Sequence, residues 1–127
     1  MAAIPDSHRD ILEKKGFASV ATVDASGSPQ SSAVWFDWDG RALTFSTTKG
    51  RAKYKNLARS PRVSILILDI DDPYRYIELR GEVTFADDPT GTLIDKLSRR
   101  YYGEPWTRPT DDRVIVSLEP DRVQVYG

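Results

Sequence analysis

The sequence has 127 residues, with 18 Lys and Arg against 19 Asp and Glu, a net charge of −1 and no cysteine. This length fits one domain over residues 1–127, and 39% hydrophobic residues suffice for an ordinary core. The lack of cysteine excludes disulfides, thiolate metal sites and a cysteine nucleophile, and the near-neutral charge disfavours a general nucleic-acid binder.

The chain shows no sequence feature of a secreted or membrane protein. Its first ten residues, MAAIPDSHRD, contain no apolar segment of the kind found in signal peptides. Its longest apolar run, residues 63–68, is too short to cross a bilayer. We therefore expect a soluble cytoplasmic protein with no membrane partner.

Periodicity and turn signals divide the chain into short strands and three helices. In chain order we predict a helix over 7–16, strands over 17–23, 30–38 and 42–48, a helix over 51–59, strands over 62–69 and 76–85, a helix over 89–102, and strands over 114–118 and 122–125. This pattern predicts a mainly β (α+β) domain, in which about seven antiparallel strands close into a small barrel capped by helices.

Local signals set the first half of this pattern. Ser7 and Asp10 have capping-box spacing at the start of the first helix. Asp39-Gly40 predicts a tight hairpin, so we expect the first three strands to form a meander. The strand over 62–69 is nearly all apolar, which predicts burial on both of its faces.

The helices and the longest strand carry further signals. In the middle helix Tyr54, Leu57 and Ala58 form the expected inward stripe, and Gly81 predicts a bulge or a bend in its strand. Asp88 is the expected N-cap of the last helix, with Pro89 at its first position. In the same helix the inward stripe comprises Leu93, Ile94, Leu97 and Tyr101, and Gly103 ends it.

No familiar catalytic set is present, so the catalytic residues stay unidentified. His8 is the one histidine, and its place near the terminus favours a surface position over a metal or catalytic role. The acidic pairs beside Pro or helix starts are explained as turns and caps, so we expect no metal site. An enzyme with this inventory would rely on a bound cofactor for its difficult chemistry.

Positive charge is concentrated in one window of the chain. Residues 40–68 contain seven Lys or Arg and no acid, which leaves 11 cations against 19 acids elsewhere. Ser46, Thr47 and Thr48 end a strand here, and Gly50, Arg51 and Lys53 follow at a helix start. Hydroxyls, free helix amides and two cations are groups that bind phosphate. The alternative is that Thr48 or Gly50 only caps the helix and the cations are solvated.

Three segments together resemble a known family. They are ASVATVDASGSPQSSAVWFDWDG, LTFSTTKGRAKYKNLARSPRVSILIL and PYRYIELRGEVTF, in that order. They resemble the split β-barrel flavin and deazaflavin oxidoreductases related to pyridoxamine 5′-phosphate oxidase, and most of all the branch that uses coenzyme F420. The resemblance implies an FMN-binding-protein-like split barrel over nearly the whole chain.

The resemblance also implies where a cofactor binds. It implies a homodimer with two cofactor sites at the subunit interface. The phosphate would be held by Arg51 and Lys53 of Gly50-Arg51-Ala52-Lys53, aided by Ser46, Thr47 and Thr48. The ring system would lie along Ala33, Val34, Trp35 and Phe36, whose main-chain groups can bond its polar edge. Tyr101, Tyr102 and Trp106 are candidates to complete the site from the other subunit.

The cofactor implied is coenzyme F420, with FMN as the alternative. Both carry a ribityl phosphate, and Lys49, Lys55 and Arg59 could guide the anionic tail that only the deazaflavin has. No residues after the last strand match those with which pyridoxamine phosphate oxidases grip their substrate, so the vitamin B6 reaction is not implied.

These considerations lead to one functional hypothesis and three rivals. We expect an F420-dependent oxidoreductase that transfers a hydride between the deazaflavin and a conjugated small-molecule substrate, with solvent as proton source. The alternatives are an FMN-dependent enzyme like pyridoxamine phosphate oxidase and a non-enzymatic binder of a flavin-like or haem-like molecule. A nucleic-acid-binding barrel is disfavoured because the rest of the chain is acidic.

Overall fold

The computed structural model describes residues 2–127, and this range contains eight strands, three α-helices and one short 3-10 helix. In chain order the elements are η1 (Asp6–His8), α1 (Arg9–Glu13), β1 (Ala18–Val23), β2 (Pro29–Val34), β3 (Asp37–Trp38), β4 (Leu43–Thr48), α2 (Ala52–Arg59), β5 (Arg62–Leu68), β6 (Tyr76–Asp87), α3 (Thr92–Tyr102), β7 (Arg113–Leu118) and β8 (Arg122–Tyr126). The predicted mainly β (α+β) split barrel is confirmed. Within residues 2–127, no helix is long and apolar enough to cross a membrane.

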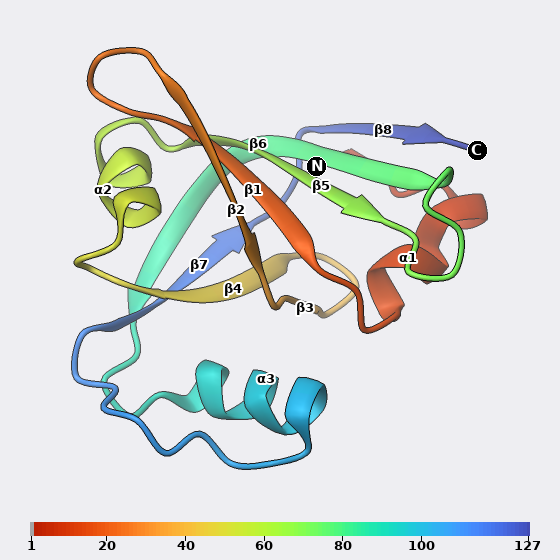
Figure 1. Cartoon of the computed structure of the whole chain (residues 1–127). Coiled ribbons are helices and arrows are strands. Elements are labelled where there is room, and N and C mark those ends of the chain that lie inside the picture. Colours follow the sequence, from red (N-terminus) through yellow and green to blue (C-terminus); the bar gives the residue numbers. More distant parts are fainter. Residues whose placement is uncertain (1) are drawn as a thin grey trace.

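The strands form one curled antiparallel sheet. Their order is β2-β1-β5-β6-β7-β4-β3, and β8 pairs with β6. The sheet curls around the core, with α2 at one end of the barrel, α1 near the other and α3 beneath it (Figure 1). The core is lined by alternate residues of the strands, including Phe45, Ile65, Leu79 and Val116.

Strand β6 joins the two halves of the barrel. Along one edge, its residues 76–80 pair with β8 and its residues 83–87 pair with β7. Gly81 lies at the change of partner, where a Cβ atom would stand 2.9 Å from Leu118 Cδ1 and 3.2 Å from the carbonyl of Glu119. The pairing of β6 with β5 runs through Gly81 without a bulge, so the glycine serves the close approach of the β7–β8 turn, which leaves no room for a Cβ atom.

The predicted strand over 30–38 is wrong, because it is two strands with a break between them. β2 pairs with β1 and ends at Val34, whereas β3 pairs with β4. Between them the chain leaves the sheet at Trp35, and the side chain of Phe36 is fully buried in the core. The predicted three-strand meander is also wrong, since β2 and β4 do not pair. One edge of β2, and the edge of β4 beyond Thr44, have no strand partner within residues 2–127.

The prediction that residues 62–69 are buried on both faces is wrong. In β5, Val63, Ile65 and Ile67 point into the core, while Leu66 and Leu68 are 37% and 45% exposed. The strand is fully buried on the barrel side only, and these two leucines stay partly open to solvent. An apolar outer face is therefore open in the single chain.

The first helix does not have the capping box predicted from Ser7 and Asp10. It is a 3-10 turn followed by α1, and no side chain caps either start within the described chain. Asp10 pairs with Arg75 and Lys14 instead of capping. His8 is buried, so the predicted surface position is wrong; its Nε2 donates to the carbonyl of Tyr126 at 2.9 Å and its Nδ1 accepts from the Ser7 hydroxyl at 2.7 Å. The histidine ties the two ends of the chain together.

The inward face of α2 is not the predicted stripe. Leu57 is buried as expected and Tyr54 is half-buried against Phe85, but Ala58 is exposed. The buried neighbour is Asn56, whose amide donates to the Thr22 hydroxyl at 3.0 Å. The polar pair lets the helix turn this face toward β1, where a hydrogen bond satisfies both side chains.

The last helix begins later than predicted. Its N-cap residue is Gly91 and its first residue is Thr92, so Asp88 is not the N-cap and Pro89 precedes the helix. The carboxylate of Asp88 nevertheless accepts the N–H groups of Thr92 (3.0 Å) and Leu93 (2.9 Å). Asp88 thus bonds the free N–H groups at the start of the helix, as an N-cap side chain would, although it lies before the N-cap residue Gly91. Gly103 ends the helix at φ +75°, as predicted.

Candidate cofactor-binding site

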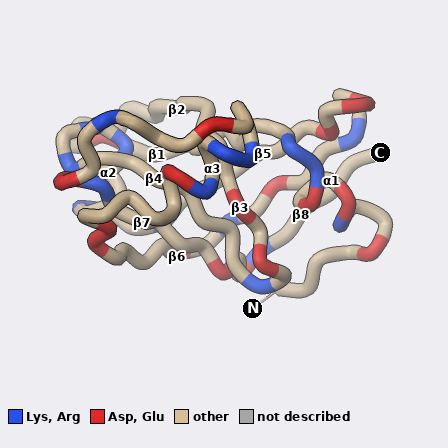
Figure 2. The backbone as a smooth tube through the Cα atoms, turned by 90° about the horizontal axis from the view of Figure 1, so that it is seen from below, with Lys and Arg blue, Asp and Glu red and all other residues tan. Residues whose placement is uncertain are grey.

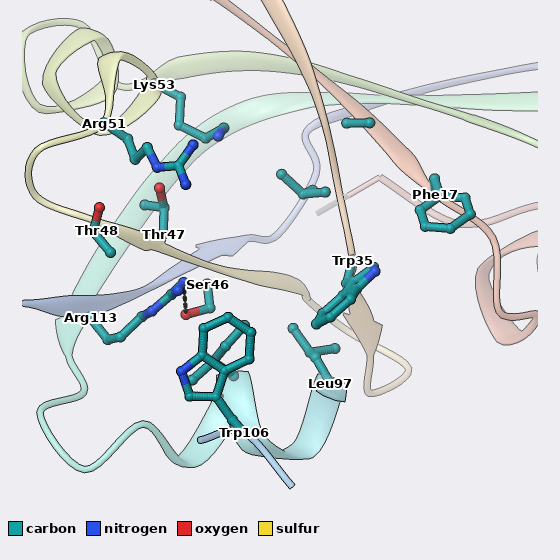
Figure 3. A pocket seen from close by; sticks show the side chains of 13 residues that line it. Phe17, Trp35, Ser46, Thr47, Thr48, Arg51, Lys53, Leu97, Trp106 and Arg113 are labelled. Carbon is teal, nitrogen blue, oxygen red and sulfur yellow. Dashed lines mark hydrogen bonds between the residues drawn. The ribbon is translucent and has the colours of Figure 1, made fainter. Parts of the chain in front are cut away.

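A cavity of about 340 Å³ lies where the barrel is split, between the unpaired edges of β2 and β4. The start of α2 closes one end and α3, with the loop after it, closes the other (Figure 3). It is lined by Phe17, Ala33, Val34, Trp35, Ser46, Thr47, Thr48, Arg51, Lys53, Ile94, Leu97, Trp106 and Arg113. Edge strands present free N–H and C=O groups, so the two walls offer main-chain hydrogen bonds to a ligand.

The polar end of the cavity combines hydroxyls, cations and a helix start. Ser46, Thr47 and Thr48 end β4, and Arg51 and Lys53 extend from the start of α2 toward them (Figure 3). Within the described chain no side chain caps α2; only the Thr48 carbonyl bonds the N–H of its N-cap residue, at 3.1 Å. The first amides of the helix are therefore left for a ligand, as at other anion-binding helix starts.

The charges at this end are not balanced by protein acids. No Asp or Glu lines the cavity in residues 2–127, and Lys and Arg positions group around α2 in Figure 2. Burial, together with the charges of Arg51 and Arg113, lowers the pKa of Lys53. Burial is also the main cause that lowers the pKa of Arg113. Cations that repel one another in a partly dry site favour an anionic ligand.

The apolar end is walled by aromatic and aliphatic side chains. The rings of Trp35 and Trp106 meet edge to face, with centroids 6.5 Å apart. Tyr101 stacks behind Trp35 at 5.3 Å, where its hydroxyl accepts the N–H of Phe36 (3.3 Å) and donates to the carbonyl of Gly16 (2.6 Å). Tyr101 therefore holds Trp35 against the cavity and does not line it.

Most of the predicted site residues are brought together in this cavity. They are Val34, Trp35, Ser46, Thr47, Thr48, Arg51, Lys53 and Trp106. Four others do not line it: Phe36 is in the core, Gly50 forms the turn before α2, Lys55 is exposed on that helix and Tyr101 lies behind Trp35.

Two of the three cations predicted to bind an anionic tail form contacts within the protein instead. Lys49 forms an ion pair with Asp87 at 3.0 Å, and Arg59 donates to the carbonyl of Val23. Tyr102 is exposed and meets the edge of Trp35 at 5.1 Å.

Four lining residues were missed by the sequence reasoning: Phe17, Ile94, Leu97 and Arg113. The apolar ones follow ordinary core patterns, so nothing in their spacing marks a site. Arg113 is the cation that matters, since β4 and β7 pair in register and place it opposite Thr48. Arg113 can be recognised as a site residue only when the pairing of β4 with β7 is known, because Thr48 and Arg113 are far apart in the sequence.

The family of the chain follows from comparison with known proteins. Residues 4–127 match the model of the family described as pyridoxamine 5′-phosphate oxidase. The chain belongs to the pyridoxamine 5′-phosphate oxidase family. This confirms the resemblance seen in the sequence and assigns an oxidoreductase class whose members bind flavins.

Solved structures agree with this assignment. A protein named F420 reductase is 40% identical with a TM-score of 0.88, and the match covers 95% of this chain and 98% of that one. A putative pyridoxamine 5′-phosphate oxidase from Listeria innocua shares the fold at 20% identity and TM-score 0.76, covering 94% and 95%. A heme binding protein from Mycobacterium smegmatis shares it at 21% identity and TM-score 0.72, covering 99% of this chain and 56% of that one.

The cavity fits a ring cofactor with a phosphate-bearing side chain. Its cations and hydroxyls suit the phosphate, its aromatic end suits a flat ring, and its unpaired edges suit the polar rim of that ring. The buried Nε of Arg113 has no hydrogen-bond partner within residues 2–127, so this donor suits an anionic group of such a cofactor.

Proposed function

We propose that this protein is an F420-dependent oxidoreductase that transfers a hydride between the deazaflavin and a conjugated small-molecule substrate. The observation that carries the proposal is the cavity, which joins a cationic end without acids to an aromatic end along two unpaired strand edges. The 40% identical relative named F420 reductase supports the choice of deazaflavin.

The residues of the chain bind and shield the cofactor in this proposal. Arg51 and Lys53, with the hydroxyls of β4, bind the phosphate, and main-chain groups near Val34 bond the ring's polar edge. Trp35 and Trp106 exclude water from the ring. When bound, the reduced deazaflavin supplies a hydride. Because no carboxyl group or histidine of residues 2–127 lines the cavity, the proton comes from solvent.

We propose that the protein forms a homodimer with its cofactor sites at the subunit interface. The outer face of the sheet is apolar or small at Ser19, Ala33, Leu66 and Leu68, which are connected through the pairings of β2 with β1 and of β1 with β5. Ala33 also lines the cavity, and Phe17 at its rim is 53% exposed. A second copy on this face would therefore cover the ring as well as the leucines.

FMN is the second candidate cofactor, because the family binds flavins and the cationic end also suits a phosphate monoester. A haem-type binder has less support in the structure. Both ring nitrogens of His8 are already hydrogen-bonded, so the one histidine is not free to bind iron.

The experiment that tests the proposal is a pair of titrations of the cofactor-free protein, one with F420 and one with FMN, followed by tryptophan fluorescence. Trp35 and Trp106 line the cavity, so we expect quenching on binding. Tighter binding of F420, and turnover of its reduced form with conjugated acceptors, would support the proposal. A preference for FMN would assign the FMN branch, and binding of neither would remove the enzyme hypothesis.

A further inference from the structure

Arg113 reaches the cavity from a different element than the predicted phosphate ligands. It is the first residue of β7, and its Nη1 donates to the Ser46 hydroxyl at 3.4 Å (Figure 3). Its guanidinium carbon lies 4.9 Å from the centre of the Trp106 ring. Arg113 thus lies where the cationic end of the cavity meets the aromatic end.

Arg113 senses the charge of its chain neighbour Asp112 but is bonded to no protein acid in the described residues. Among residues 2–127 it forms no ion pair, whereas Lys14, Lys49, Arg62 and Arg75 all do. Its Nε is buried without a hydrogen-bond partner in the same range, and its one hydrogen bond, to a neutral hydroxyl, is long. Leaving a charged group desolvated and unpaired is costly, so a ligand anion is the expected partner.

A purely structural role would be to support Trp106 by cation–π contact. Arg108 already offers such a contact, with its guanidinium carbon 5.7 Å from the ring centre, and it does not line the cavity. The structural role also leaves the buried Nε unexplained. Support of Trp106 also does not explain why Arg113 lines the cavity together with Arg51 and Lys53, where no Asp or Glu of the described residues is present.

We propose that Arg113 is a third ligand of the cofactor's phosphate group, and that it makes the site select phosphate-bearing ring molecules over the same rings without phosphate. Because Arg113 lies against Trp106, it also fixes the distance between the phosphate end and the ring end of the site. The inference rests on the proposed function only in its use of a ring cofactor with a phosphate.

The test compares ring ligands with and without phosphate. FMN and riboflavin differ in the phosphate alone, whereas F420 and its phosphate-free deazaflavin differ in the anionic tail as well, so the FMN pair is decisive. FMN is titrated against riboflavin, and F420 against its phosphate-free deazaflavin, in wild type and in Arg113→Gln. We expect Arg113→Gln to weaken FMN or F420 binding about tenfold to a hundredfold, the size of one charged hydrogen bond, and to leave binding of the phosphate-free rings within about twofold. Arg113→Lys keeps the charge and is expected to recover part of the loss.

Arg108→Gln is the matched control, because it removes the other cation near Trp106 from outside the cavity and should leave the phosphate preference unchanged. An equal loss for ligands with and without phosphate would reduce Arg113 to a support of Trp106. No loss for either would overturn the proposal outright.

Failure of this inference and failure of the proposed function give different results. A wild type that prefers FMN removes F420, yet the comparison of FMN with riboflavin still tests Arg113. A wild type that binds neither ring is titrated with inorganic phosphate, and equal affinity of Arg113→Gln for that ion would contradict the inference. If F420 binds and Arg113→Gln keeps the full phosphate preference, only the role of Arg113 falls.

Discussion

Arg51, the N-cap residue of α2, and Lys53, in its first turn, both line the same end of the cavity (Figure 3). We predict that Arg51→Ala combined with Lys53→Ala weakens FMN or F420 binding by a few kcal/mol, since each charged hydrogen bond contributes about 1.5–3 kcal/mol. Fluorescence titration measures this loss. Lys55→Ala is the control for FMN, because Lys55 is exposed and outside the cavity. Unchanged affinity in the double variant would contradict the phosphate site.

Asp10 provides a second prediction at this scale, through its ion pairs with Arg75 (3.0 Å) and Lys14 (3.4 Å). The hydrogen bond from Arg75 is the largest cause that lowers the pKa of Asp10 to about 2. A carboxyl group with a lowered pKa stabilises the fold above its unfolded pKa, near 4, and loses that effect as the pH falls to about 2.

Thermal melting between pH 5 and pH 2 checks this effect. We expect the Tm of wild type to fall over that range, and the Tm of Asp10→Asn to be lower at pH 5 and to fall less. The difference should be modest, since the Asp10 side chain is 46% exposed and water screens its pairs. Parallel pH profiles of the two proteins would show that Asp10 does not contribute.

At the scale of the element, α3 depends on a carboxylate that precedes it. Asp88→Ala removes the acceptor for the N–H groups of Thr92 and Leu93, so we expect a loss of about 0.5–2 kcal/mol in the free energy of unfolding. Since α3 carries Ile94 and Leu97 to the cavity, cofactor affinity should fall as well. Denaturant unfolding and fluorescence titration measure the two effects. The exposed Asp111, changed to Ala, should alter neither.

The elements themselves were largely predictable, because strand alternation and glycine or proline signals act over a few residues. The errors lie where long-range packing decides. The core requires Phe36, and this need breaks a run that reads as one strand into β2 and β3. The apolar residues Leu66 and Leu68 predict burial, but both side chains are exposed in the single chain.

In the candidate site too, the residues that are neighbours in the sequence were predictable, and those brought in by long-range packing were not. Residues 46–53 are contiguous, so their hydroxyls and cations are visible as one cluster in the sequence. Arg113 joins them only through the pairing of β4 with β7, and Phe17 only because β1 begins beside the break at Trp35. His8 shows the opposite error, since nothing near it in sequence reveals the Tyr126 carbonyl that it meets.

At the scale of the whole molecule, the open face of β5 provides a test of the proposed dimer. We expect Leu66→Lys to weaken self-association at least about a hundredfold, because a charge would be buried at the interface. Leu66 is 37% exposed in the single chain, so the fold of the monomer should tolerate the change. Analytical ultracentrifugation measures the loss of self-association. Cofactor titration measures the loss of affinity that should accompany it, because the proposed cofactor sites lie at the interface.

Ile70→Lys is the matched control, since Ile70 is exposed in the loop after β5 and lies off the sheet face. A wild type that sediments as a monomer at all concentrations would overturn the dimer. Dissociation caused equally by Ile70→Lys would place the interface elsewhere.

The position of β6 in the strand order has a consequence for how the molecule opens. Residues 76–80 lie between β5 and β8, whereas β2 and β3 are the two ends of the sheet and bound its open seam. Amide hydrogen exchange should therefore be slowest in that part of β6 and fastest in β2 and β3. Since the cavity lies on this seam, we expect a bulky ring to enter or leave through local opening of β2 and β3 while the central strands stay paired.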